Sequence, residues 1–338
     1  MSSIEHRLVD VILFLTKVST PLFVWVFGMT MAYVYYDQLE DAKRFQRLKH
    51  RVWKRALYVF LAHQFLVVVI DTYERPSFDF IISHLFYQRL GNWIEVLNFY
   101  LVILFVTPWV LQWWRKTELW ARCIIIPGLY AVGFFLADIE VPQILFVLKD
   151  IVTGHRGSDT FPVLQFSPFY LVGLSFGEFL FERVRDKQMR SLFWRTGLIA
   201  VVCAAGSFIW SGLDPIEYIK AMVDDLYKFP AQPPYILLGF SGILLVTLLC
   251  LWVFEIKKMS NAFTAAIEML GRHSLLTFVL QYIFLFTMYG LMLDMLHQQR
   301  FIGSFLNTSV AIVAVAFLIW AWERWRRTKK TMESQSLS

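Results

Sequence analysis

Apolar runs of about 20 residues recur along most of this 338-residue chain, and they constrain its fold more than any other feature. A helix of that length can cross the ~30 Å hydrocarbon core of a membrane, because it pairs its backbone polar groups internally. Hydrophobic residues make up 57% of the chain and charged residues 17%, a balance that would leave a soluble domain with large exposed apolar patches. We therefore predict an all-α, polytopic integral membrane helix bundle with about nine transmembrane helices.

The predicted spans form a single membrane-embedded domain over residues 1–330, followed by a disordered tail at 331–338. They are Val9–Tyr36, Val52–Asp71, Trp93–Trp114, Leu119–Ala137, Phe161–Phe181, Ser191–Trp210, Pro234–Phe254, Ser274–Leu293 and Phe301–Trp322. The first run is too long for one straight crossing. Ser19 and Thr20 before Pro21 are typical of a helix start, so we expect an interfacial helix to about Val18 and then the true span.

The distribution of basic residues predicts the orientation of the chain in the membrane. Most of the 32 Lys and Arg residues fall in the odd-numbered connections and the C-terminal tail. Lys and Arg are retained on the cytoplasmic side during insertion, so these segments and the C-terminus are predicted to be cytoplasmic. The same count places Met1 outside, which suggests that one further span could precede it. We expect an integral protein of a bacterial inner membrane.

Charge and cysteine usage argue against two other classes of partner. The net charge of +6 is explained by the membrane orientation, so no nucleic-acid partner is expected. Cys123, Cys203 and Cys250 are far apart and have no neighbouring Cys or His in a metal-ligand spacing. We predict no metal site and no tightly bound cofactor.

Basic residues are densest just before the second span, where seven of the thirteen residues from Lys43 to Arg55 are Lys or Arg. One interpretation is an anchor that holds this loop in the cytoplasm. The other is a binding surface for a phosphorylated donor such as an acyl-CoA, because the planar guanidinium of Arg can bind phosphate through two hydrogen bonds.

His63 lies inside the second span, ~12 Å deeper than Arg55 along the helix. Polar groups at that depth are costly and usually face the bundle interior, where they often serve a function. The alternative is a neutral His bonded to a neighbouring helix. Asp71, two turns further on, is expected near the outer surface and solvated.

Four polar residues on the predicted outer side are candidates for binding a substrate. Lys17 either extends to the headgroups or binds an anionic group near the outer mouth. His155 and Arg156 lie in a polar loop that could present hydrogen bonds to a sugar or be merely solvated. Lys228 precedes three prolines that make a rigid start for the next helix. On the cytoplasmic side, Arg272 opens the eighth span as an anchor or a second donor contact.

Five motifs follow one another along nearly the whole chain. They are Thr16-Lys17-x-x-x-Pro21-Leu22-Phe23-x4-Gly28, Lys54-Arg55-Ala56-Leu57-Tyr58 after the basic run, Phe161-Pro162-x5-Pro168-Phe169-x3-Gly173-x3-Gly177, Lys228-Phe229-Pro230-x-x-Pro233 and Gly271-Arg272-His273-Ser274-Leu275-Leu276. Together they resemble the motifs of the transmembrane acyltransferase superfamily, which includes acyltransferase-3, glucan succinyltransferase and heparan-α-glucosaminide acetyltransferase proteins.

The resemblance implies transfer of an acyl group from cytoplasmic acyl-CoA to a hydroxyl or amine of an envelope glycan or lipid-linked saccharide. Residue by residue, it implies that Arg51, Lys54 and Arg55 contact the CoA phosphates. It also implies that Lys228 and Arg272 line the site.

Two departures from the family pattern bear on the catalytic base. The family's first helix, with its Arg and catalytic His, has no counterpart here, and Gln281 stands where a later helix often continues to a His. Either the chain is shortened at its N-terminus, or catalysis is lost or shifted, with His63 as the candidate base.

The leading hypothesis is an integral-membrane acyltransferase in which a base deprotonates the acceptor as it attacks the thioester carbonyl. The alternatives are a secondary transporter that uses His63, Lys17 and Asp71 as a polar path, and a non-catalytic membrane partner that retains the fold. A transporter would show inverted repeats, and the sequence has no convincing repeat.

Overall fold

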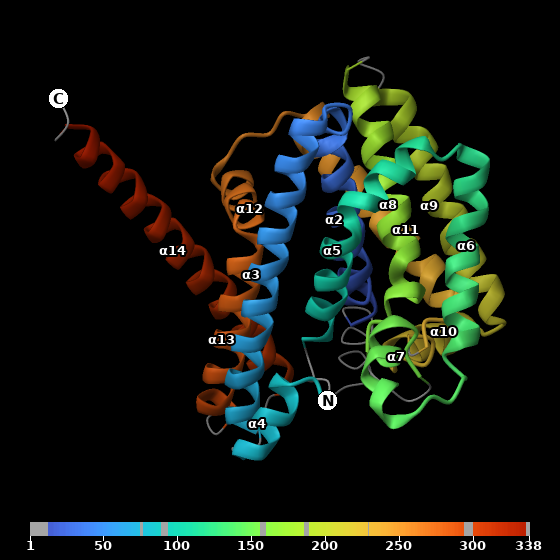
Figure 1. Cartoon of the computed structure of the whole chain (residues 1–338), viewed down its shortest axis with the longest axis horizontal. Helices are drawn as coiled ribbons and strands as arrows, with labels where there is room; N and C mark the ends of the chain where they lie inside the picture. The colour runs from blue at the N-terminus through green and yellow to red at the C-terminus, as the bar shows by residue number, and fades with distance from the viewer. Residues whose placement is uncertain are drawn as a thin grey trace. The chain divides into compact units, whose positions relative to one another are not determined.

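The computed structural model describes residues 13–74, 77–88, 94–155, 160–185, 189–228, 230–293 and 300–335, and every element in these ranges is a helix. The chain divides into two compact units (Figure 1). Unit 1 comprises Met1–Leu61 and Tyr87–Trp252, and unit 2 comprises Ala62–Phe86 and Val253–Ser338. One helix, α3, contributes to both units. The prediction of one domain over residues 1–330 stays a prediction.

Unit 1 contains most of the helices. They are α2 (Ser19–Tyr35), the first part of α3 (Ala42–Glu74), α5 (Glu95–Lys116), α6 (Leu119–Leu136), α7 (Phe146–Val152), α8 (Val163–Arg185), α9 (Met189–Ser211), α10 (Pro215–Val223) and α11 (Pro233–Leu251), with 3-10 turns at Tyr36–Gln38 and Gln143–Leu145. Unit 2 contains the rest of α3, α4 (Phe78–Leu85), α12 (Ala262–Arg272), α13 (Ser274–Leu293) and α14 (Arg300–Gln335). A π-helical segment, Trp252–Ile256, continues from α11.

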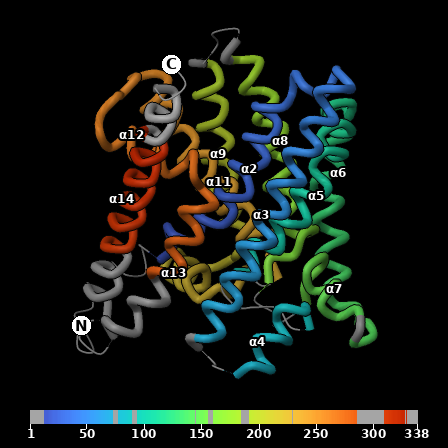
Figure 2. The backbone as a smooth tube through the Cα atoms, turned by 60° about the vertical axis from the view of Figure 1, so that its left-hand side comes forward, coloured from blue at the N-terminus to red at the C-terminus, as the bar shows by residue number. Residues whose placement is uncertain are grey.

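Seven helices in the described part of the chain are long and apolar enough to cross a membrane. They correspond to the first seven predicted spans, which confirms the all-α polytopic membrane fold. The eighth and ninth predicted spans are helical as well, as α13 and α14 (Figure 2). Nine crossings stay a prediction. Helix α14 continues to Gln335 and so includes residues 331–335 of the predicted tail.

The first long apolar run is broken where the sequence predicts, but by a different local structure. The chain turns at Lys17–Val18 and α2 begins at Ser19. The predicted N-cap of Ser19 and Thr20 is wrong, because Val18 occupies the cap position and no side chain caps the helix. The Ser19 hydroxyl instead donates to the Thr16 carbonyl at 2.6 Å, back into the preceding turn.

Helices α2 and α8 pack closely through three glycines that belong to the motifs of the sequence. Gly28 of α2 faces the backbone carbonyl of Tyr170, and Gly173 and Gly177 of α8 face the carbonyls of Trp25 and Met29. A Cβ at any of the three would collide with the facing backbone. Small residues let helix backbones approach in a membrane, where no hydrophobic force between helices drives packing. Helix α6 also packs on α8, and α9 packs on α11.

A buried charged network joins α6, α8 and the end of α2. The Arg122 guanidinium bonds the Glu178 carboxylate at 2.6 Å, with both side chains less than a fifth exposed. The Tyr36 hydroxyl donates to the same carboxylate at 2.8 Å, and Arg122 also donates to the carbonyls of Trp114 and Thr117. The ion pair is therefore satisfied by additional hydrogen bonds, as a buried charge pair requires.

Candidate active site

The basic segment before the second span forms one exposed face of α3. Arg44, Arg47, Arg51 and Arg55 project within ~80° of one another at 100° per residue, and all four are exposed. The buried residues Leu48, Val52, Ala56 and Val59 form the adjacent face. The helix thus packs through its apolar stripe and presents an arginine stripe, defined here as those four arginines, on the outside.

Aromatic rings and an amide hold several of these cations in place. Arg51 donates to the Gln38 amide oxygen at 2.9 Å and lies over the Tyr35 ring. Lys54 lies over Tyr58, with its Nζ 5.9 Å from the ring centroid. Arg51 also donates to the Arg47 carbonyl of its own helix at 3.4 Å, so these contacts restrict the positions of the cations on the exposed face of α3.

Two predicted substrate-binding lysines meet at one carboxylate in unit 1. Lys17 Nζ lies 2.7 Å from Asp225 Oδ1, and Lys228 Nζ lies 3.7 Å from the same oxygen. The Lys228 ammonium also lies 5.3 Å from the centroid of the Phe161 ring. Asp225 has a left-handed backbone, with φ of 56°. The two lysines and Asp225 thus bring the segment before α2 and the segment before α11 together.

His155, another predicted substrate-binding residue, forms a pair with a buried carboxylate. Its Nδ1 lies 2.6 Å from Asp150 Oδ1, and Asp150 is 5% exposed. A carboxylate can only accept, so Nδ1 donates and Nε2 of the neutral ring is left with a lone pair. The Phe146 ring packs against the imidazole, with centroids 4.9 Å apart. The arrangement orients His155 as a proton acceptor. Arg156 lies outside the described residues.

A pocket of about 380 Å³ opens beside this pair between the end of α6 and α7. It is lined by Ala137, Asp138, Ile139, Glu140, Val141, Phe146, Lys149 and His155. The Lys149 ammonium donates to the Ala137 carbonyl at 2.8 Å, which fixes α7 against the end of α6. Carboxylates, an ammonium and an imidazole around one small volume suit a ligand with several hydroxyl groups.

Gln165 connects two loops of unit 1, the loop after α7 that contains His155 and the loop before α11 that contains Lys228. Its amide nitrogen donates to the Thr153 carbonyl at 2.9 Å, and its amide oxygen accepts from the Ala231 backbone N–H at 3.0 Å. Gln165 is fully buried near the start of α8. One side chain therefore holds the loop that follows α7 and the loop that precedes α11 at the same end of the bundle.

His63, the predicted catalytic base, is buried in unit 2 at 2% exposure. Its electrostatic neighbour is His84 of α4, whose Nδ1 lies 2.6 Å from Asp71 Oδ2. The prediction of a solvated Asp71 is wrong, because Asp71 is 4% exposed and paired with His84. The short α4 folds back against α3 and covers this carboxylate.

Arg272, the predicted second donor contact, lies at the end of α12 in unit 2. Its guanidinium is 3.9 Å from Glu323 Oε1, and the neighbouring His273 bonds the same oxygen through Nε2 at 2.8 Å. The side chain of Arg272 is 59% exposed, so most of it remains available to solvent.

Several of these partners were not predicted from the sequence. His84 and Asp225 form pairs that spacing along the chain does not reveal. Arg122 and Glu178 could have been found, because charges within predicted spans are expensive and usually paired.

Comparison with known proteins decides the family. A model of the OpgC protein family matches residues 71–328, more than half of the chain. The chain belongs to the OpgC protein family. This is an acyltransferase-like membrane family of glucan modification, which confirms the coarser part of the predicted resemblance. No curated protein and no solved structure matches the chain.

The OpgC match separates the candidate residues into two groups. It includes Lys228, Arg272 and the His155–Asp150 pair. Lys17, Arg51, Lys54, Arg55 and His63 precede the matched segment.

Proposed function

We propose that this OpgC family member is an integral-membrane acyltransferase that places an acyl group on a hydroxyl of an envelope glucan or related glycan. One observation carries the proposal: a histidine oriented by a buried carboxylate borders a polar pocket in a chain of a glucan-modifying family. The acceptor in this proposal is a periplasmic glucan, and the acyl donor is acyl-CoA.

In the proposed reaction, His155 activates the acceptor. Asp150 holds the ring so that Nε2 can take the proton of a sugar hydroxyl, as a general base. The hydroxyl oxygen attacks the thioester carbonyl, so a C–O bond forms and the C–S bond breaks. The proton held by His155 then passes to the departing CoA thiolate. Asp138 and Glu140 offer hydrogen-bond acceptors for the remaining hydroxyl groups of the sugar.

The arginine stripe of α3 is the proposed site for the CoA phosphates. It combines four exposed guanidinium groups on one helix face, and each can bind a phosphate through two hydrogen bonds. Lys54 extends the same surface. The sequence predicts this stripe on the cytoplasmic side and His155 on the outer side. The proposed direct attack therefore requires the pantetheine arm of the bound CoA to extend into the bundle, so that the intact thioester reaches His155.

His63 is the alternative base, and one set of variants separates it from His155. Purified protein in liposomes is supplied with radiolabelled acyl-CoA and glucan, and transfer is measured for His155→Gln, His63→Gln and the control His50→Gln, an exposed histidine of α3. Loss of a general base lowers the rate by roughly 10²–10⁴-fold. We expect that loss for His155→Gln, and unchanged transfer for His50→Gln.

Acyl-CoA binding, measured on the same variants, distinguishes a lost base from a lost fold. His155→Gln should bind the donor normally, whereas Arg51→Gln should weaken donor binding about tenfold, because hydrogen bonds to charged groups contribute ~1.5–3 kcal/mol. Full activity in His155→Gln, with loss of activity in His63→Gln, would identify His63 as the general base instead. Unchanged donor affinity in Arg51→Gln would refute the arginine stripe as the donor site.

A further inference from the structure

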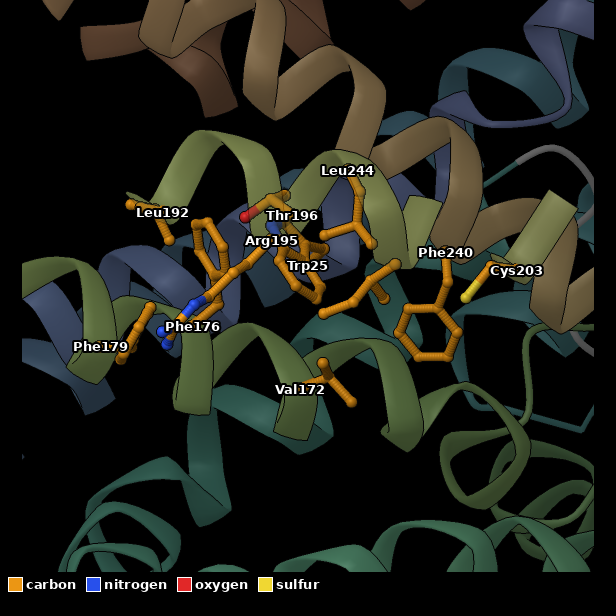
Figure 3. Close-up of a pocket in the computed structure, with 11 residues that line it drawn as sticks. Trp25, Val172, Phe176, Phe179, Leu192, Arg195, Thr196, Cys203, Phe240 and Leu244 are labelled. Carbon is orange, nitrogen blue, oxygen red and sulfur yellow. The ribbon is translucent and has the colours of Figure 1, made fainter. Parts of the chain in front are cut away.

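A second cavity of unit 1, about 410 Å³ in volume, differs in chemistry from the pocket beside His155. It lies among α2, α8, α9 and α11, and its lining side chains converge on one space (Figure 3). The lining residues are Trp25, Val172, Phe176, Phe179, Leu192, Arg195, Thr196, Ile199, Cys203, Phe240 and Leu244. Its volume falls in the range of small-molecule sites, ~300–1,000 Å³.

The walls of this cavity are almost entirely apolar. Aromatic rings of Phe176 and Phe240 pack on Trp25, with ring centroids 5.2 and 6.3 Å away. Trp25 is 1% exposed, and its indole N–H has no hydrogen-bond partner in the structure as described. A buried donor without a partner is costly. The indole N–H is enclosed by protein atoms, and the surface that lines the cavity is apolar, so the cavity suits an apolar chain.

Arg195 is the charged residue among those that line the cavity. Arg195 is exposed, and it forms no ion pair or hydrogen bond with any described residue. Figure 3 shows its guanidinium beside Phe176 and Phe179, at the end of the cavity where Leu192 also lies. An arginine placed there can bind an anionic group, most readily a phosphate.

The length of the cavity matches one leaflet of a membrane. From Leu192 to Cys203, α9 rises ~16 Å, which is about half of the ~30 Å hydrocarbon core. Leu192 lies near the start of α9, where the helix leaves the predicted cytoplasmic connection. The outer face of α9 is also apolar, with Trp194, Leu198 and Ile209 at least two-thirds exposed. A lipid can therefore approach α9 from the side.

We propose that this cavity binds one anionic phospholipid of the predicted cytoplasmic leaflet. Its phosphate bonds to Arg195, and one acyl chain lies along Phe176, Phe240 and Cys203. The occupant is independent of the glycan and of the acyl-CoA in the proposed reaction. The lining lacks the polar groups that a sugar or a nucleotide would need.

Cys203 provides a direct probe of occupancy, since it lines the cavity and is a free thiol. The full-length protein is delipidated in a neutral detergent and titrated with phosphatidylglycerol or phosphatidylcholine. Alkylation by N-ethylmaleimide is then followed at each cysteine by mass spectrometry. Cys250 and Cys123 are exposed thiols on α11 and α6 and report general coverage by lipid.

We expect phosphatidylglycerol to slow alkylation of Cys203 about tenfold and to leave Cys123 and Cys250 nearly unchanged. Arg195→Gln should raise the phosphatidylglycerol concentration needed for protection roughly tenfold, as expected for a lost charge-assisted bond. Arg195 is exposed, so its substitution is compatible with folding, which an unchanged far-ultraviolet circular dichroism spectrum and unfolding transition would verify.

Three outcomes would overturn the proposal. The first is equal protection of all three cysteines, which would show that lipid covers the surface without entering the cavity. The second is equal protection by both lipids with no effect of Arg195→Gln, which would remove the phosphate contact. The third is protection of Cys203 by palmitoyl-CoA but not by phosphatidylglycerol, which would make the donor's acyl chain the occupant.

Discussion

Substituting Gly173 by Ala tests the close contact between α2 and α8 directly. A Cβ at Gly173 would meet the backbone carbonyl of Trp25, which cannot rotate away as a flexible side chain could. The two helices must therefore separate or tilt. Overpacking of this kind costs about 1–3 kcal/mol.

The matched control is Gly128→Ala in α6, because a Cβ at Gly128 would meet no atom within 4 Å. Both glycines lie in helix interiors, so both variants gain a similar intrinsic helix preference of up to about 1 kcal/mol. That gain cancels when the two variants are compared. The difference between their free energies of unfolding should therefore be about 1–3 kcal/mol, with Gly173→Ala the less stable.

Equilibrium unfolding by sodium dodecyl sulfate, followed by far-ultraviolet circular dichroism, measures this difference. The parent protein and both variants are compared in the same detergent. A Gly173→Ala variant as stable as Gly128→Ala would refute the close backbone contact and, with it, the structural role assigned to the glycine motifs.

Three further predictions concern charged groups. Arg122→Ala should destabilise the protein by roughly 3–5 kcal/mol, because it leaves Glu178 buried without its cation, and Arg122→Lys should lose less in the same unfolding assay. A double-mutant cycle of Lys17→Ala and Asp225→Asn should give a coupling of about 0.2–1 kcal/mol, and strict additivity would contradict the ion pair. Asp41, just before α3, accepts hydrogen bonds from the backbone N–H groups of Lys43 and Arg44, and these bonds lower the pKa of its carboxyl below the ordinary 3.8. This contribution is complete above pH 3.8 and is lost as the pH falls through the lower folded value. The Lys43 amide resonance, observed with isotope-labelled lysine, should therefore titrate with a midpoint below pH 3.8, and this titration should be absent in Asp41→Asn.

Three of the predicted site residues pair with carboxylates that the sequence did not identify as their partners. The sequence predicted Lys17, Lys228 and His155 as outer-side residues, and the structure places them in unit 1 with Asp225 and Asp150 as partners. Neither carboxylate could be chosen in advance, since Asp225 directly follows Asp224, and Asp150 lies between Glu140 and Asp159 in the sequence. His63 was found from its depth within a span, but its neighbour His84 lies in a separate short helix.

The sequence alone determined the long helices, their order and the membrane environment, whereas the short helices α4, α7, α10 and α12 were not predicted from it. In lipid every backbone polar group must be paired within the protein, so each long apolar run has to become a helix. Only the tertiary structure decided which faces of those helices meet. Helices such as α2, α9 and α11 are apolar on all sides, so no periodicity along them marks an inner face. The pairing of α2 with α8 depends instead on where glycines remove side chains, and that pairing creates the cavity that Trp25 shares with Phe176 and Phe240.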